Sequence, residues 1–193
     1  MKLYMIRHGQ STANEGRLHA GWSQVPLTDR GLEDARRAGT LLTGIHFDKI
    51  YVSDLIRAQQ TMETALPGAV GVATPLLREI NVGDLAGKNA QECLEIYGEK
   101  YLTDKAAHDF VPYNGENSAM HLDRIREFAD LAAREEGACI AAFCHEGSIR
   151  CMLDLVLGYR HDRKEYKLYN GSVSVFELKA GRWSLVTWNN TAG

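Results

Sequence analysis

Short apolar runs and longer amphipathic segments alternate along the chain. Residues 2–6, 49–52 and 139–144 form apolar runs of strand length, and the third of these contains no alternating polar residue. Such an uninterrupted run is typical of a strand that is covered on both faces of a parallel sheet. A shorter run at residues 70–73 predicts a further strand.

The segments between these runs carry apolar residues at helical spacing. Thr28 or Asp29 provides an N-cap for a first helix. Similar signals predict helices that begin near residues 53, 117 and 148. The tail predicts an antiparallel hairpin with strands at residues 172–178 and 183–188.

This order of elements predicts an α/β fold. We expect a three-layer α/β/α sandwich with a mostly parallel central sheet, in one domain over residues 1–193. The polar stretch at residues 83–117 predicts irregular structure with one helix near residues 90–97. In sheets of this kind, ligands bind beyond the carboxyl ends of the strands.

Composition narrows the class of protein. The chain has 193 residues, of which 45% are hydrophobic and 24% charged, and its formal net charge is −3. That charge argues against a nucleic-acid-binding protein, which usually presents a basic face. No apolar stretch approaches the ~20 residues that cross a bilayer. The four cysteines show no CxxC spacing, so we expect reduced thiols and a cytoplasmic protein.

Two histidines follow two of the predicted strands. Arg7-His8-Gly9 comes directly after the first apolar run, and His145-Glu146-Gly147 comes directly after the run at residues 139–144. Because both strands are expected to be parallel, both histidines should lie at the same edge of the sheet. Arginine presents a fork of donors to phosphoryl oxygens, and neutral imidazole is a good nucleophile. The pattern therefore predicts a phosphate site at this edge.

Two further residues lie near the same predicted edge. Arg57 falls in the first turn of the helix that follows the second strand, and Glu79 follows the strand at residues 70–73 among several glycines. Taken alone, each is more simply a solvated surface charge. Their common position relative to the sheet makes them candidates for the phosphate site.

Together these segments resemble the histidine phosphatase superfamily, also called the phosphoglycerate mutase-like family. The resemblance covers nearly the whole chain. Several ordered motifs with compatible spacing are more specific than any one of them. The motifs that carry the resemblance are Arg7-His8-Gly9-x-Ser11-x-x-Asn14, Pro26-Leu27-Thr28-x-x-Gly31, Ser53-Asp54-x-x-Arg57-Ala58, Glu79-x-x-x-Gly83-x-x-x-Gly87, Gly115-Glu116 and His145-x-Gly147.

The resemblance implies a catalytic role for three of these residues. His8 would attack phosphorus in line and become a phosphohistidine, which water then hydrolyses. Glu79 would protonate the leaving alkoxide and later accept a proton from water. His145 would stabilise negative charge as an imidazolium, because an adjacent phosphate dianion raises its pKa.

The resemblance also implies how phosphate is held. Arg7 and Arg57 would clamp the phosphoryl oxygens, and Asn14 and Ser11 would add hydrogen bonds. This chemistry requires no metal or other cofactor, and the implied partner is a small-molecule phosphomonoester rather than a nucleic acid or a membrane. We expect residues 83–117 to form a cap over the site.

Residues that would contact the leaving group of the substrate can be proposed only from their positions along the chain. Ala20 and Gln24 replace a glutamine and an aspartate of the common family pattern, and Glu146 stands where a small residue is frequent. Glu146 could repel a second anion or hydrogen-bond a hydroxyl, and both readings stay open. The candidates for this side are Arg17, His19, Trp22, Tyr97 or Tyr101, and Glu116.

The histidines outside the two motifs show no spacing typical of metal ligands. We therefore expect all of them on the surface. They are His19, His46, His108, His121 and His161.

A cysteine-dependent phosphatase is an alternative. Cys144 and Arg150 fit the Cys-x5-Arg phosphate loop of that class, after a strand and at the start of a helix. This reading leaves Arg7-His8-Gly9, Arg57 and Glu79 unexplained. We therefore expect Cys144 to be a buried strand residue and Arg150 an ordinary helix arginine.

Two other functions are also alternatives. A non-catalytic module that binds phosphorylated ligands would not need both His8 and Glu79. A cofactor-dependent phosphoglycerate mutase would use the same pocket, but such enzymes are generally longer and carry an Arg-Arg segment in the region of residues 87–117. Here that region has no arginine and more acidic than basic residues. We therefore predict a phosphatase, as a monomer or a homodimer.

Overall fold

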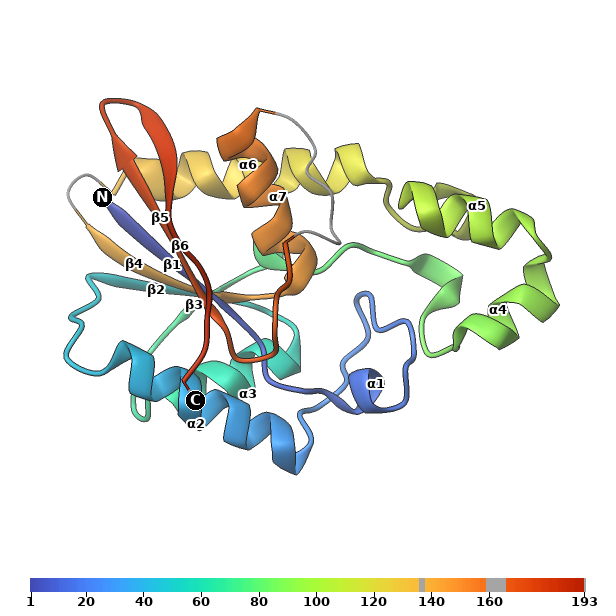
Figure 1. The fold of residues 1–193 in the computed structure, drawn as a ribbon, viewed down its shortest axis with the longest axis horizontal. Helices are drawn as coiled ribbons and strands as arrows, with labels where there is room; N and C mark the ends of the chain where they lie inside the picture. The colour runs from blue at the N-terminus through green and yellow to red at the C-terminus, as the bar shows by residue number, and fades with distance from the viewer. Residues whose placement is uncertain (136–137, 159–165, 193) are drawn as a thin grey trace.

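The computed structural model describes residues 1–135, 138–158 and 166–192. In this part of the chain, six strands form one sheet in the order β3-β2-β4-β1-β5-β6 (Figure 1). The strands are β1 (Lys2–Arg7), β2 (Lys49–Ser53), β3 (Val72–Thr74), β4 (Cys139–Cys144), β5 (Val173–Lys179) and β6 (Arg182–Asn190). The helices are α1 (Thr12–Glu15), α2 (Asp29–Leu42), α3 (Ile56–Ala65), α4 (Ala90–Tyr97), α5 (Lys100–Ala107), α6 (Ser118–Ala133) and α7 (Glu146–Leu157), with short 3-10 turns η1 (Pro75–Leu77), η2 (Gly83–Leu85) and η3 (Val111–Tyr113).

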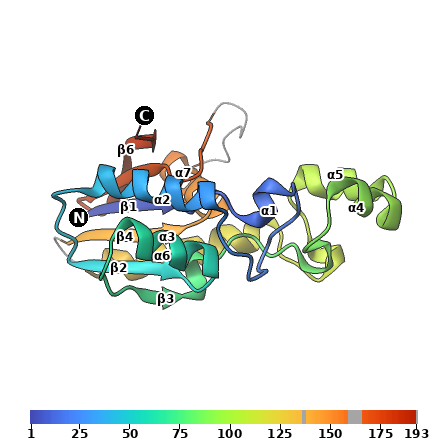
Figure 2. The same ribbon diagram turned by 90° about the horizontal axis from the view of Figure 1, so that it is seen from below.

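The sheet is mixed, with a parallel centre. β1 pairs with β4, β4 with β2, and β2 with β3 in parallel, whereas β5 and β6 are antiparallel. Helices α2 and α3 cover one face and α6 and α7 cover the other (Figures 1 and 2). This arrangement confirms the predicted α/β/α sandwich, including the C-terminal hairpin.

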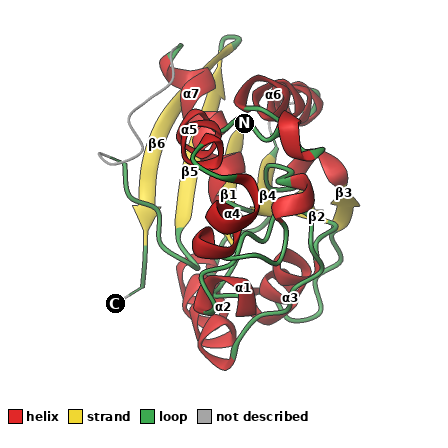
Figure 3. Cartoon of the chain, turned by 90° about the vertical axis from the view of Figure 1, so that its right-hand side faces the viewer, coloured by secondary structure: helices red, strands yellow, loops and turns green. Residues whose placement is uncertain are grey.

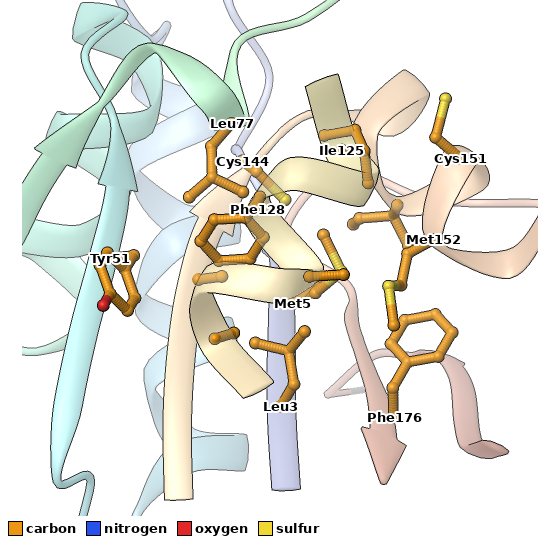
Figure 4. Close-up of a cluster of buried hydrophobic side chains, with 14 of the residues drawn as sticks. Leu3, Met5, Tyr51, Leu77, Ile125, Phe128, Cys144, Cys151, Met152 and Phe176 are labelled. Atoms are coloured by element: carbon orange, nitrogen blue, oxygen red, sulfur yellow. The ribbon is translucent and has the colours of Figure 1, made fainter. Parts of the chain in front are cut away.

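The central strand β4 shows why the apolar run at residues 139–144 lacks alternation. Ile140, Ala142 and Cys144 face α6 and α7, in the cluster that Figure 4 shows around Phe128. The intervening Ala141 and Phe143 pack against α2 and α3. Both faces of the strand therefore lie in apolar surroundings, as is expected of a central strand in a parallel sheet.

Several boundaries differ from the prediction. The third strand lies at Val72–Thr74 rather than at residues 70–73, and Val70 is 90% exposed. β3 is one of the two edge strands of the sheet, so little burial defines its limits. Helix α7 begins at Glu146, two residues before the predicted start. None of the helices in the described ranges has the length and apolar character needed to cross a bilayer.

Residues 83–117, here called the cap, contain more regular structure than predicted. Besides α4 they form α5, and both project beyond the sheet at the end where β1 and β4 finish (Figures 1 and 2). Figure 3 views the molecule from that end, with α4 and α5 in front of the strands. A separate apolar cluster holds the cap together, with Leu85, Cys93 and Tyr101 all fully buried. Residues 83–117 have few apolar residues because only this small core has to be buried.

The loop after β1 is held by the start of α2. Thr28 caps this helix, and its hydroxyl oxygen accepts from Gly31 N and donates to the carbonyl of Gln10. A Cβ at Gly9 would lie 2.1 Å from the Gly31 carbonyl oxygen, so the backbones meet without room for side chains. This contact needs glycine and fixes the loop that carries His8.

Candidate active site

The two motif histidines meet where β1 and β4 end. Arg7 is in register with Cys144, and His8 N donates to the Cys144 carbonyl at 3.0 Å. The rings of His8 and His145 lie edge to face with their centroids 5.1 Å apart. The structure thus brings together the two junctions that the sequence placed at one edge of the sheet.

The structure holds His8 as a neutral imidazole. Its Nδ1 lies 2.7 Å from the Gly9 carbonyl oxygen. A carbonyl only accepts, so Nδ1 carries the proton and Nε2 keeps a lone pair. Burial holds the pKa of His8 well below its ordinary value, and the charges of Arg57 and Arg7 lower it further. His8 is therefore neutral at physiological pH.

Arg57 is a buried cation that forms no salt bridge with any of the described residues. Its side chain is 1% exposed, and its Nη1 and Nη2 donate to the carbonyls of Ser23 and Gly21 at 3.0 and 2.8 Å. Its Nε has no hydrogen-bond partner within the described residues. Burial lowers the pKa of Arg57 to about 10, which still leaves it protonated at neutral pH.

Arg7 supplies the second guanidinium. Its Nη1 donates to the Leu168 carbonyl at 2.6 Å, and its Nη2 lies 3.1 Å from Glu146 Oε2. Its buried Nε also lacks a partner in the part of the chain that the structure describes. Glu146 also accepts from Arg150 Nε at 2.9 Å, so it holds both guanidinium groups. Arg150 is only 4% exposed and is therefore not an ordinary solvated helix arginine.

Glu79 is oriented by backbone N–H groups. Its Oε1 accepts from Ile80 N at 2.9 Å and its Oε2 from Gly147 N at 3.1 Å. A Cβ on residue 147 would lie 2.0 Å from Glu79 Oε1. The glycine of the His145-x-Gly147 motif therefore leaves space for this carboxylate.

A second group of residues holds the backbone of Glu79. Trp22 Nε1 and Arg124 Nη2 both donate to the Glu79 carbonyl, at 2.8 and 3.1 Å. The Trp22 ring lies beside the guanidinium groups of Arg78 and Arg124, 4.6 and 5.8 Å from its centroid. Glu116 in turn pairs with Arg124 at 2.8 Å. Sequence reasoning placed Trp22 and Glu116 on the substrate, but in the structure they brace the loop that carries Glu79.

Ser11 and Asn14 form a pair at α1. Ser11 caps the helix and is fully buried, and its N and Oγ both donate to Asn14 Oδ1 at 3.0 Å. These two bonds to Oδ1 orient the Asn14 amide group, whose nitrogen is its hydrogen-bond donor and can donate to a ligand. Asn14 lines the cavity described below, whereas Ser11 orients Asn14 from beneath it.

These residues surround a cavity of about 300 Å³. Most of the predicted site residues line it, together with residues of the loop after α1 and of the cap. His145 is not among the residues that line the cavity, and its Nε2 is 2.9 Å from Ser53 Oγ. The lining residues are Arg7, His8, Asn14, Leu18, His19, Ala20, Gly21, Arg57, Glu79, Ile80, Val82, Lys105, His108, Phe110, Glu146 and Gly147.

Burial and the charge of Arg57 also hold the pKa of His145 well below its ordinary value. A phosphate dianion beside His8 would act in the opposite direction and favour the imidazolium. The predicted rise in pKa thus depends on the phosphate and not on the protein groups around the ring.

The cavity residues that could contact the leaving group differ from the candidates assigned from the sequence. Of the six candidates, only His19 lines the cavity. Tyr101 is fully buried and donates to or accepts from His19 Nε2 at 2.7 Å, so it supports this wall without forming it. Lys105 and His108 line the cavity from the cap and were missed, because nothing in a polar segment marks which side chains point inward.

The expectation that the remaining histidines lie on the surface is only partly correct. His46 is exposed, but His19 and His108 are half-buried at the cavity. His121 is 1% exposed, and its Cε1 would lie 2.8 Å from a Cβ at Gly147. It is buried because α6 packs against the start of α7. His161 lies outside the described residues.

The geometry argues against the cysteine-dependent mechanism. Cys144 is fully buried in the apolar cluster between the sheet and α6 (Figure 4), and it does not line the cavity. Burial raises the pKa of its thiol far above the ordinary range, which disfavours the nucleophilic thiolate. Within the described ranges, no group of three or more His, Cys, Asp or Glu side chains is placed to hold a metal ion.

Comparison with known proteins decides the family. The model of histidine phosphatase superfamily branch 1 matches residues 3–191. The chain belongs to the histidine phosphatase superfamily.

Its relatives in the superfamily include both mutases and phosphatases. A 2,3-bisphosphoglycerate-dependent phosphoglycerate mutase of Azorhizobium caulinodans is 35% identical over 78% of this chain and 79% of its own. The adenosylcobalamin/alpha-ribazole phosphatase of Escherichia coli is 28% identical over 98% of this chain and 91% of its own. The crystal structure of the alpha-ribazole phosphatase from Shigella flexneri superimposes with a TM-score of 0.90 at 26% identity, over 98% of this chain and 96% of that chain. This histidine phosphatase superfamily member is therefore an enzyme of the phosphatase and mutase group.

Burial of the two neutral imidazoles predicts a pH dependence of stability. The pKa values of His8 and His145 are lowered in the folded protein, so below about pH 6.5 the unfolded chain binds more protons than the folded one. The free energy of unfolding should therefore decrease as the pH falls below about 6.5, by up to about 1.4 kcal/mol per pH unit for each group. Chemical denaturation across this range measures the slope.

The His8→Gln variant isolates one of the two contributions. Its slope should be shallower than that of the wild type, whereas a His46→Gln variant at an exposed position should keep the wild-type slope. Equal slopes in wild type and His8→Gln would contradict the prediction.

Proposed function

We propose that this protein is a phosphatase that hydrolyses a small phosphomonoester through a phosphohistidine at His8, without a metal ion. The observation that carries the proposal is the neutral His8 imidazole beside two guanidinium groups whose buried Nε atoms have no partner among the described residues. Such cations are stabilised by an anion with several acceptor oxygens. A phosphoryl group has that charge and shape.

The first chemical step forms a nitrogen–phosphorus bond. The lone pair of His8 Nε2 attacks phosphorus while the bond to the leaving oxygen breaks, and protonated Glu79 transfers its proton to that oxygen. Arg7 and Arg57 neutralise the equatorial oxygens, where repulsion would otherwise oppose the attack. The Asn14 amide adds a hydrogen bond, and His145 stabilises the same charge as an imidazolium.

The second step regenerates the enzyme. Water attacks the phosphohistidine from the side that the alcohol has left, and the Glu79 carboxylate accepts a proton from this water. The nitrogen–phosphorus bond breaks, and the electron pair returns to His8 Nε2. Inorganic phosphate leaves, and Glu79 is protonated for the next cycle.

A phosphoglycerate mutase is the second candidate, and the identity of the curated mutases over 78% of the chain favours it. A mutase must retain a bisphosphate while it reorients, which needs basic side chains around the outer part of the cavity and protection from water. Lys105 is the side chain that carries a full positive charge into this wall from the cap, while α4 and α5 contain several acidic residues. The similarity of the alpha-ribazole phosphatases over 98% of the chain supports the hydrolase.

The proposal predicts a covalent adduct at His8. Rapid quenching of turnover with a labelled phosphomonoester should trap an acid-labile, base-stable phosphate on His8, and His8→Ala should lose activity by about a thousandfold or more. Cys144→Ser should retain both the adduct and turnover, since this thiol lies in the core. Label on a thiol would contradict the mechanism, and wild-type inactivity on every monoester would favour a binding module.

The contacts of Trp22 predict a positioning role that acts through Glu79. Trp22→Phe removes one of two donors to the Glu79 carbonyl and should lower kcat on the order of tenfold with little change in KM. The loss should be smaller for p-nitrophenyl phosphate, whose leaving group needs less protonation than an alkoxide. Trp188 also donates its Nε1 to a backbone carbonyl, that of Lys167, so Trp188→Phe is the matched control. Equal losses in both variants would show that the effect is structural.

The ratio of hydrolysis to transfer separates the two candidate functions. Purified protein should release inorganic phosphate from its best monoester faster than it interconverts 2- and 3-phosphoglycerate when primed with 2,3-bisphosphoglycerate. Coupled assays for each product measure both rates on one preparation. Faster interconversion than phosphate release would replace the phosphatase with a mutase.

A further inference from the structure

The peptide between His8 and Gly9 is held at both of its polar ends. Its N–H, which belongs to Gly9, donates to Thr61 Oγ1 at 3.1 Å. Its carbonyl, which belongs to His8, accepts from the side-chain amide of Asn170 at 3.0 Å and from Gly171 N at 3.3 Å. These partners come from α3 and from the segment that precedes β5, so two distant parts of the chain fix one peptide of the site.

Thr61 contacts this peptide from a fully buried position on α3. Its hydroxyl donates to the Arg57 carbonyl at 2.7 Å, one turn earlier in the helix. Because its hydrogen is used there, the hydroxyl oxygen accepts the Gly9 N–H through a lone pair. Within the described residues, Gly9 N has no other acceptor. One hydroxyl therefore connects the turn of α3 that carries Arg57 with the loop that carries His8.

The conformational freedom of Gly9 makes these contacts necessary. The close approach of Gly9 to Gly31 leaves no room for a Cβ at this position. A glycine backbone is less restricted than that of any other residue, so the residue itself does not fix the direction of the Gly9 carbonyl. That carbonyl accepts the proton of His8 Nδ1 at 2.7 Å, which leaves Nε2 with its lone pair. Other groups must therefore hold the backbone here if the imidazole is to keep this tautomer.

We propose that Thr61 is a positioning residue for His8, supported by Asn170 at the other end of the same peptide. This inference rests on the proposed function, in which His8 Nε2 attacks phosphorus. Rotation of the peptide between His8 and Gly9 would move the Gly9 carbonyl away from Nδ1 and allow the proton to reside on Nε2 instead. The Nε2–H tautomer has no lone pair on the attacking nitrogen. Thr61 thus acts on the reaction by keeping His8 in its nucleophilic form.

Substitution of Thr61 tests this role. Thr61→Val keeps the size of the side chain and removes the hydroxyl, so kcat for the best monoester should fall on the order of tenfold with little change in KM. Thr61→Ser restores the hydroxyl and should keep kcat within about twofold of the wild-type value.

Ser174→Ala is the matched control. Ser174 is also fully buried, and its Oγ also accepts a backbone N–H, that of Asn189, at 3.1 Å. This variant should keep the wild-type kcat, because the contact lies between β5 and β6 and not at His8. Equal losses in Thr61→Val and Ser174→Ala would show a general effect of losing a buried hydroxyl and would overturn the proposal.

The tautomer of His8 is the readout that separates positioning from a loss of stability. Long-range ¹H–¹⁵N correlation spectra of protein labelled with ¹⁵N-histidine distinguish protonated from unprotonated ring nitrogens, and His8→Gln assigns the signals. At about pH 8, where the imidazole is neutral, the wild type should show the Nδ1–H tautomer. Thr61→Val should raise the share of the Nε2–H tautomer. Asn170→Ala should raise it less, because Gly171 N still donates to the His8 carbonyl.

The spectra need no substrate, so they separate this inference from the proposed function. A wild type that releases no phosphate, but whose His8 tautomer depends on Thr61, would overturn only the hydrolase. Turnover by the wild type with an unchanged tautomer in Thr61→Val would overturn the positioning role and leave the phosphatase standing. Where Thr61→Val does not fold, Asn170→Ala carries the test, and an unchanged tautomer in that variant would overturn the proposal.

Discussion

The site is organised around the guanidinium of Arg57, which is buried and forms no salt bridge within the described residues. Arg57 gives its terminal nitrogens to the carbonyls of Gly21 and Ser23, and its Nε has no partner among the described residues. Burial of such a charge is unfavourable, and the fall of its pKa to about 10 reflects this. Burial holds the pKa of His8 well below its ordinary value, and the charges of Arg57 and Arg7 lower it further, so the buried cation helps to keep this imidazole neutral.

The scaffold keeps this charge and the reacting groups in fixed positions by close backbone contacts. The loop after β1 meets α2 at Gly9 and Gly31, where a Cβ would approach a carbonyl oxygen within about 2.1 Å. Gly147 leaves space for the Glu79 carboxylate and donates to it. Trp22 and Arg124 hold the Glu79 carbonyl from the other side. Rigid placement of this kind lowers the reorganisation needed during phosphoryl transfer.

The cap is a separate unit of packing. Its apolar cluster around Tyr101 is distinct from the two clusters on the faces of the sheet. The cap contributes Lys105 to the wall of the cavity although it is acidic in composition. The net charge of the segment therefore does not show which of its charges the folded structure places at the cavity.

Much of the architecture was readable from the chain alone. The uninterrupted apolar run of β4, the Thr28 cap and the C-terminal hairpin were predicted, because burial on both faces, capping and turn formation are properties of short segments. The meeting of His8 with His145 was predicted for the same reason, since parallel strands end at one edge. The extent of β3 and the existence of helix α5 were not predicted, because an edge strand and a small cap core contain few apolar residues.

The sequence by itself thus determined the sheet, its order of elements and the meeting of the two histidine motifs where β1 and β4 end. Only the tertiary structure decided that Ser11, Trp22 and Glu116 support other site residues, that His121 is buried, and that Lys105 faces the cavity. The position of each of these side chains depends on which groups from distant segments form its hydrogen bonds and salt bridges. Such pairings are set by packing in three dimensions and leave no mark in local sequence pattern.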